Sequence, residues 1–233
     1  MISKNQSLAV NVLSIAYFAT AMVEIMAELF DYKPLIFIFK PLMPALLITL
    51  YLFSSKVRNP LYVIAMLLSV VTNILFIPND QQMLLFAIIA FMLHRIIILW
   101  LIFKLMRLND YIPVAIATIP FLLIFFYLLT TSTEIPENSF WLLAIQNVLI
   151  AVLGGAALSN YIMNDNRKNS WLLISGLLFV VLQFIVFLEK YYLTDLSPAI
   201  FRPIAMGLNA FAFYTFYEFV IATEKSDDNG TAN

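Results

Sequence analysis

The stretch LIFIFKPLMPALLITLYLF, residues 35–53, places one lysine and two prolines inside a long apolar run. At about 1.5 Å per residue, a helix of this length approaches the thickness of the hydrocarbon core of a bilayer. A charged side chain near the bilayer centre costs about 2.5–3.5 kcal/mol on insertion scales, so such residues usually face a bundle interior. Lys40 therefore predicts polar partners on other helices. The alternative is that Lys40 reaches its ammonium out to the membrane interface.

The composition of the whole chain also indicates a protein that lies in a lipid bilayer. Hydrophobic residues make up 63% of the 233 residues and charged residues 12%, and the mean hydropathy is +0.93. Soluble domains average about 45–50% apolar and 25% charged residues. The composition therefore predicts an integral membrane protein. The net charge of −1, without a concentrated basic block, argues against nucleic-acid binding, which needs a cationic surface.

Cysteine and histidine usage limits the possible chemistry. The chain has no cysteine, which excludes disulfides and thiolate chemistry, and it has a single histidine, His94. A histidine-rich metal centre is therefore not expected. We predict a site that works without a metal or cofactor.

Eight apolar runs long enough to cross a membrane follow one another, separated by short polar breaks, and they predict an all-α, polytopic membrane bundle. We expect one transmembrane domain over residues 1–223 and a disordered polar tail over 224–233. Lys4 and Ala19-Thr20-Ala21 resemble a signal peptide, but the run continues to Met26, which favours a first span. The expected spans are Leu8–Leu29, Leu35–Phe53, Leu61–Pro78, Met83–Phe103, Ile112–Thr130, Phe140–Tyr161, Trp171–Lys190 and Ala199–Ile221.

The distribution of Lys and Arg over the short loops predicts the orientation. The loops after the second, fourth and sixth spans are the basic ones, and they contain Lys56, Arg58, Lys104, Arg107, Arg167 and Lys168. With Lys4 and Lys225 at the ends, this side outweighs the side of Lys33, Lys190 and Arg202. Both termini should therefore be cytoplasmic, and a bacterial inner membrane fits so compact a chain.

One segment of the sixth span consists only of small residues, Gly154-Gly155-Ala156-Ala157. Small residues allow the backbones of membrane helices to approach closely. We interpret this segment as a helix packing surface rather than a binding motif.

Polar residues inside the spans are the candidates for a site, and Glu24 and Glu28 share one helix face because they are four residues apart. We expect Glu28, Lys40, His94 and Arg95 to meet in a common cavity. The alternative is a set of scattered interhelical hydrogen bonds, each worth about 0.6 kcal/mol. The full set is Glu24, Glu28, Lys40, Asn73, His94, Arg95, Gln146, Asn147, Gln183, Asn209 and Glu218.

Five short motifs follow one another along the chain: FKPLMP (39–44), SVVTNILF (69–76), AFMLH (90–94), SGLLF (175–179) and YTFYE (214–218). They resemble those of a known family, the YhhN family of eight-span membrane proteins, which includes lysoplasmalogenases. The resemblance extends over nearly the whole chain. The order and spacing of the first three motifs are its most specific part.

The resemblance implies which positions should matter. Lys40, Pro41, His94 and Tyr214 match the family pattern. The departures are Thr72-Asn73 where the family has Gly-Asp, Leu182-Gln183 where it has Ser-Asp, and Glu218 where it has glutamine. Both family aspartates are thus amides in this chain.

The implied activity is hydrolysis of the vinyl ether bond of lysoplasmalogens, which releases a fatty aldehyde and a glycerophospho headgroup. Such a reaction needs a proton donor and a water-activating base, and an amide cannot exchange a proton in this way. We expect Glu28, His94 and Glu218 as catalytic candidates. Glu218 is either a relocated carboxylate or the result of simple divergence. The expected lipid-binding residues are Lys40, Asn73, Arg95, Gln183 and Tyr214.

Two alternatives to this enzyme hypothesis remain open. The chain could be a non-catalytic family member that binds or moves an amphiphilic lipid, because it lacks the two aspartates. A transporter unrelated to the family is the other alternative, and it would require broken helices at corresponding positions of two halves. We expect a lipid or lysolipid substrate as the partner.

Overall fold

A computed structural model describes residues 4–78, 80–106, 111–132, 135, 137–192 and 198–230. Arg107 and residues 1–3 and 231–233, used in the expectations above, lie outside these ranges. Within the described part the regular structure is helical, which confirms the expected all-α membrane bundle. The eight helices are α1 (Lys4–Leu29), α2 (Lys33–Ser54), α3 (Pro60–Leu75), α4 (Gln81–Met106), α5 (Ile112–Thr131), α6 (Glu137–Met163), α7 (Arg167–Tyr191) and α8 (Pro198–Gly230).

Seven of these helices are long and apolar enough to cross a membrane, and α3 is the shorter one. With 16 residues, α3 ends at Leu75 rather than at Pro78 as the sequence predicted. The reason is local, because a residue before proline is disfavoured in the helical conformation. At its start, Pro60 takes the first helical position and the Asn59 side chain caps the helix by accepting from the Leu61 N–H at 3.0 Å.

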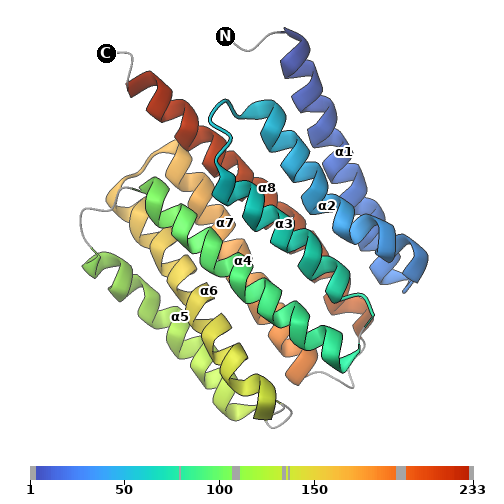
Figure 1. The fold of residues 1–233 in the computed structure, drawn as a ribbon. Coiled ribbons are helices and arrows are strands. Elements are labelled where there is room, and N and C mark those ends of the chain that lie inside the picture. The colour runs from blue at the N-terminus through green and yellow to red at the C-terminus, as the bar shows by residue number, and fades with distance from the viewer. Residues whose placement is uncertain are drawn as a thin grey trace.

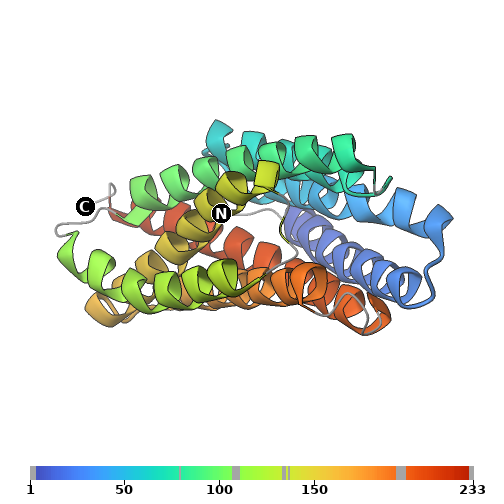
Figure 2. The same ribbon diagram turned by 90° about the horizontal axis from the view of Figure 1, so that it is seen from below.

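Seven helices form a closed ring. Successive helices from α1 to α4 pack side by side, α4 packs on α6, α6 on α7, α7 on α8, and α8 returns to α1. Figure 2 shows the cyan-to-green α2, α3 and α4 along one side and the blue α1 and orange-to-red α7 and α8 along the other. Helix α5 lies outside the ring against α6, and α1 begins at the same end of the bundle at which α8 ends (Figure 1).

The contact between α5 and α6 depends on glycine. A Cβ atom on Gly155 would lie 2.1 Å from the Oγ1 atom and 2.7 Å from the Cα atom of Thr118 on α5. A Cβ on Gly176 of α7 would lie 2.6 Å from the Cβ of Ala157 on α6. These contacts confirm the interpretation of residues 154–157 as a packing surface.

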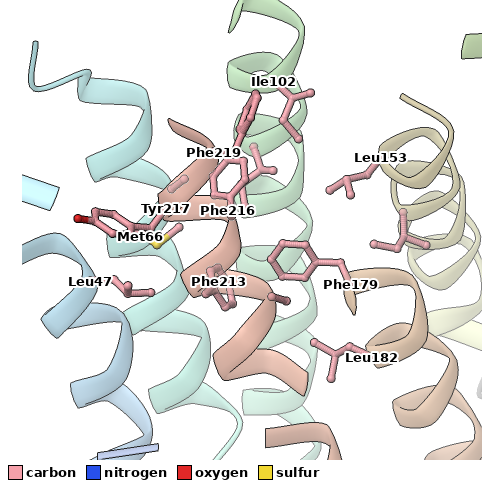
Figure 3. Packing of buried hydrophobic residues seen from close by; sticks show 14 of the residues in the cluster. Leu47, Met66, Ile102, Leu153, Phe179, Leu182, Phe213, Phe216, Tyr217 and Phe219 are labelled. Carbon is pink, nitrogen blue, oxygen red and sulfur yellow. The ribbon is translucent and has the colours of Figure 1, made fainter. Parts of the chain in front are cut away.

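Large aromatic side chains of the hydrophobic core lie in the half of the ring near the termini. Phe213, Phe216 and Phe219 of α8 point into the ring, between α2, α3 and α4 on one side and α7 on the other (Figure 3). Leu47, Met66, Ile102, Phe179 and Phe216 belong to one buried cluster. Large side chains of α8 thus occupy the inside of the ring at this level.

The C-terminal boundary differs from the expectation. Helix α8 continues beyond residue 223 to Gly230, into the segment for which disorder was expected. The Glu224 carboxylate accepts hydrogen bonds from the Tyr51 and Ser55 hydroxyls, both at 2.6 Å. The sequence pattern missed this contact because hydrogen bonds, and not apolar packing, attach this part of α8 to the end of α2.

Candidate functional site

Lys40 has an ionic partner inside the bundle. Its Nζ atom donates to the Oε1 atom of Glu28 on α1 at 2.7 Å, and the two side chains are 13% and 5% exposed. The turn between α1 and α2, with Asp31 in the left-handed region at φ 48°, brings the two residues together. Lys40 thus has the carboxylate partner that the sequence predicted, on a neighbouring helix, and its side chain is largely but not fully buried.

Asn73 is held by the same segment of α2. Pro44 lacks an N–H group, so the carbonyl oxygen of Lys40 has no helical donor four residues later. The Nδ2 group of Asn73 on α3 donates to that carbonyl at 3.1 Å. A neighbouring helix thus supplies the missing hydrogen bond, which an apolar membrane interior requires.

Arg95 of α4 lies deep in the bundle and is 4% exposed. Its guanidinium donates to the Gln183 Oε1 atom at 2.6 Å and to the Gln146 carbonyl at 3.3 Å, and it stands 4.2 Å from the centre of the Phe91 ring. Within the described residues no carboxylate forms an ion pair with Arg95. The buried charge is therefore held by neutral oxygens and an aromatic face.

Around Arg95 several polar atoms have no hydrogen-bond partner among the described residues. They are the Gln146 Oε1, Asn147 Nδ2 and Thr72 Oγ1 atoms. The Gln183 Nε2 group donates to Asn147 Oδ1 at 3.1 Å, so the amides form a connected layer. Buried polar groups normally form hydrogen bonds. These unpaired donor and acceptor atoms could therefore bond to water or to a polar ligand.

Most of these residues line a cavity of about 330 Å³ in the half of the ring away from the termini: Glu28, Lys40, Thr72, Asn73, Arg95, Gln146 and Gln183, but not Asn147. All seven ring helices contribute, and the apolar part of its wall includes Phe76, Phe91 and Leu182. Five cations and three carboxylates line it, a formal excess of two positive charges: Lys33, Lys40, Arg95, Lys190 and Arg202 against Glu28, Asp31 and Glu189. No three side chains of His, Asp or Glu gather in a metal-binding group within the described residues.

The outer part of the cavity carries its own charged groups. Arg202 of α8 donates to Glu189 of α7 at 2.9 Å. The Lys190 ammonium lies 5.1 Å from the centre of the Phe76 ring and forms no ion pair in the described part of the chain. Like Arg95, Lys190 is a cation without a bound carboxylate.

Five of the eight predicted site residues line this cavity: Glu28, Lys40, Asn73, Arg95 and Gln183. His94 does not. It is 1% exposed, its Nδ1–H donates to the Ala65 carbonyl at 2.7 Å, and its ring lies against Phe91 and Phe213. On α4 it faces the core next to Arg95, so the expectation that His94 joins the common cavity is corrected.

Glu218 and Tyr214 also lie elsewhere. The Tyr214 hydroxyl donates to Ser14 at 3.3 Å, and its ring packs on Tyr17 and Phe18 of α1. Glu218 follows one turn later on α8, toward the C-terminus and away from the cavity lining. Glu218 is therefore too far along α8 to replace the carboxylate that the family has at position 183.

The charged groups of the outer cavity were missed as site residues. Lys33, Lys190 and Arg202 were counted only as loop charges, because they lie at the expected ends of spans. A signal was present in the pair Glu189-Lys190, two charges on the last turn of an apolar helix. Periodicity alone does not show that such helix ends converge on one opening.

The fold and the cavity define a polytopic helical membrane protein with a cation-rich cavity between its helices. The chain belongs to the YhhN family, whose family model matches residues 35–223. Helix α1, with Glu24 and Glu28, precedes the matched range. Neither a curated protein nor a solved structure matches the chain.

Proposed function

We propose that this protein binds a single-chain ether phospholipid in the cavity and hydrolyses its vinyl ether bond, as the resemblance to lysoplasmalogenases implies. The observation that carries the proposal is the Arg95 guanidinium, which is buried in the cavity and forms no ion pair with a carboxylate of the described residues. Burying an unpaired charge is unfavourable unless a partner is supplied. A lipid phosphate would supply two oxygens to the planar guanidinium fork.

The rest of the cavity fits the same ligand. The excess of positive charge favours an anion, and Lys40 and Lys190 offer further donors around it. Phe76, Phe91 and Leu182 supply apolar surface for the chain of the lipid. A small anionic headgroup with one hydrocarbon chain combines both requirements.

Glu28 is the group suited to proton transfer. Its carboxyl lines the cavity and is held by Lys40. In the acid form it would donate its proton to the vinyl carbon, forming a C–H bond and leaving an oxocarbenium ion opposite the new carboxylate. Water adds to that ion and returns a proton to Glu28, and the hemiacetal then separates into aldehyde and alcohol. Such proton transfers contribute about 10²–10⁴-fold to rate.

A second function is favoured by a different observation. Asn73 and Gln183 stand where the resemblance implies aspartates, and both amides are engaged, Asn73 with the Lys40 carbonyl and Gln183 with Arg95. Neither can titrate. This arrangement supports a family member that binds or moves an anionic lysolipid without cleaving it.

One experiment separates the two functions. Purified protein is mixed with a lysoplasmalogen in detergent, and both lipid binding and fatty aldehyde release are measured. We expect Arg95→Gln to weaken binding by about 10–100-fold, the value of hydrogen bonds to a charged group. Glu28→Gln should remove aldehyde release with binding retained. Arg167→Gln, on the exposed start of α7, is the matched control.

The outcomes are distinct. Aldehyde release by the wild-type protein that Glu28→Gln abolishes supports the hydrolase. Binding that depends on Arg95, without release of aldehyde, supports the non-catalytic function. Binding that is equally strong in the wild type and in Arg95→Gln contradicts both.

A further inference from the structure

Glu24 has the least exposed side chain of the ionisable residues described in α1. Its side chain is 0% exposed, and neither carboxyl oxygen has a partner in the described part of the structure. It lies one helical turn before Glu28, on the same face, so the two carboxyls are neighbours. The mechanism proposed above leaves this buried acid unused.

The charges around Glu24 belong to the cavity. Glu28, one helical turn from Glu24 on the same face of α1, holds the Lys40 ammonium at 2.7 Å and so brings that charge toward Glu24 as well. Lys40 therefore stands near two carboxyl groups. One ionised carboxylate balances its charge, and a second would be an uncompensated charge in an apolar interior. The bond at 2.7 Å assigns the ionised carboxylate to Glu28.

We propose that Glu24 is the proton store of this site, and that Glu24 and Glu28 share one carboxyl proton across Lys40. When the proton leaves Glu24 and a proton reaches Glu28, Lys40 remains cationic and pairs with Glu24 instead. The net charge of the three groups is zero in both arrangements. Glu28 in its acid form then faces the cavity, ready to donate.

This inference deepens the proposed hydrolysis and rests on it for its role in turnover. The step at the vinyl carbon consumes the proton on Glu28, and the proton released by the adding water restores it. Because Asn73 and Gln183 cannot hold this proton, the titrating pair comes from α1, the helix that precedes the family match. Two coupled carboxyls with different surroundings are a common means of separating acid and base roles.

The proton store is tested by chemical labelling of the full-length protein in detergent. Dicyclohexylcarbodiimide, an apolar reagent, adds to protonated carboxyl groups in apolar surroundings, and peptide mass spectrometry locates the adduct. We expect an adduct on Glu24 and none on Glu28. Asp165, exposed between α6 and α7, serves as the water-facing control and should stay unlabelled. An unlabelled Glu24 would overturn the proposal.

Two variants test whether the proton is shared. In Glu28→Gln, Glu24 is the carboxyl that remains on this face of α1 for Lys40, so it should ionise and its labelling should fall by about tenfold or more. In Lys40→Met no cation holds Glu28 ionised, so Glu28 should become labelled as well. A merely structural buried acid would label equally in all three proteins, and that result would refute the sharing.

Turnover separates this inference from the proposed function. If the wild-type protein releases aldehyde, Glu24→Gln should lower kcat by about 10²-fold with KM unchanged, and Glu24→Asp should restore part of it. Full activity of Glu24→Gln contradicts the proton store and leaves the hydrolase standing. If no aldehyde forms but labelling of Glu24 depends on Glu28, the shared proton stands and the hydrolase does not.

Discussion

At the scale of single residues, the role of Asn73 is set by a proline on another helix. Pro44 removes the donor that would bond the Lys40 carbonyl, and the Asn73 amide replaces it at 3.1 Å. An ionised aspartate at position 73 has only acceptor oxygens and could not make this bond. The amide is therefore suited to the local backbone of α2 and supports the segment that carries Lys40.

This reading predicts energetic coupling between residues 44 and 73. Asn73→Ala should destabilise the protein by about 0.6–1.7 kcal/mol, the range of interhelical hydrogen bonds in membrane proteins. In the background of Pro44→Ala, which restores an N–H to the Lys40 carbonyl, the same substitution should cost much less. Unfolding of the four proteins in mixed detergent micelles measures the cycle. Equal costs in both backgrounds would show that Asn73 does not compensate for the proline.

At the scale of helices, the attachment of α5 depends on one glycine. Gly155→Ala would place a methyl group against the Thr118 backbone, which cannot move aside as a flexible side chain does. We expect a loss of about 1–3 kcal/mol from overpacking, seen as a lower unfolding temperature in detergent. Lipid binding in the cavity should change little, because α5 contributes no residue to the cavity lining.

Gly207→Ala is the matched control for this prediction. A Cβ on Gly207 would meet only the Ile25 Cδ1 atom, at an ordinary 3.6 Å. Both substitutions bring the same gain in helix propensity, up to about 1 kcal/mol. If the Gly155→Ala protein is as stable as Gly207→Ala, α5 and α6 can move apart to accept the methyl group without a loss of stability, which would contradict the prediction.

At the scale of the whole molecule, the cavity faces the end of the bundle opposite the termini. Since the distribution of Lys and Arg predicts cytoplasmic termini, we expect the cavity to open on the other side of the membrane. The chain has no cysteine, so a single introduced cysteine is the only residue of this protein that a maleimide would label through a thiol. Asp31→Cys at the cavity opening should react with a membrane-impermeant maleimide in intact cells, and Asp165→Cys should react only after lysis. The reverse pattern would invert the orientation.

The sequence alone determined that the chain lies in a membrane, where its helices are and to which family it belongs. The apolar runs predicted the helices to within a few residues, because helix length in a membrane is set by hydrocarbon thickness. It also determined that Lys40 needs a buried partner, since an unpaired cation is costly at membrane depth. Where helix ends differed, as at Leu75 and beyond Ile221, a proline or a side-chain hydrogen bond was the cause.

Only the tertiary structure decided which polar residues share a cavity. Arg95 and His94 are neighbours in sequence, yet Arg95 faces the cavity and His94 the core, because consecutive helical residues point about 100° apart. The closure of the ring by α8 on α1 brings Lys190 and Arg202 to the opening near Lys40. Ring closure depends on contacts between helices far apart in the chain, and no local sequence pattern encodes those.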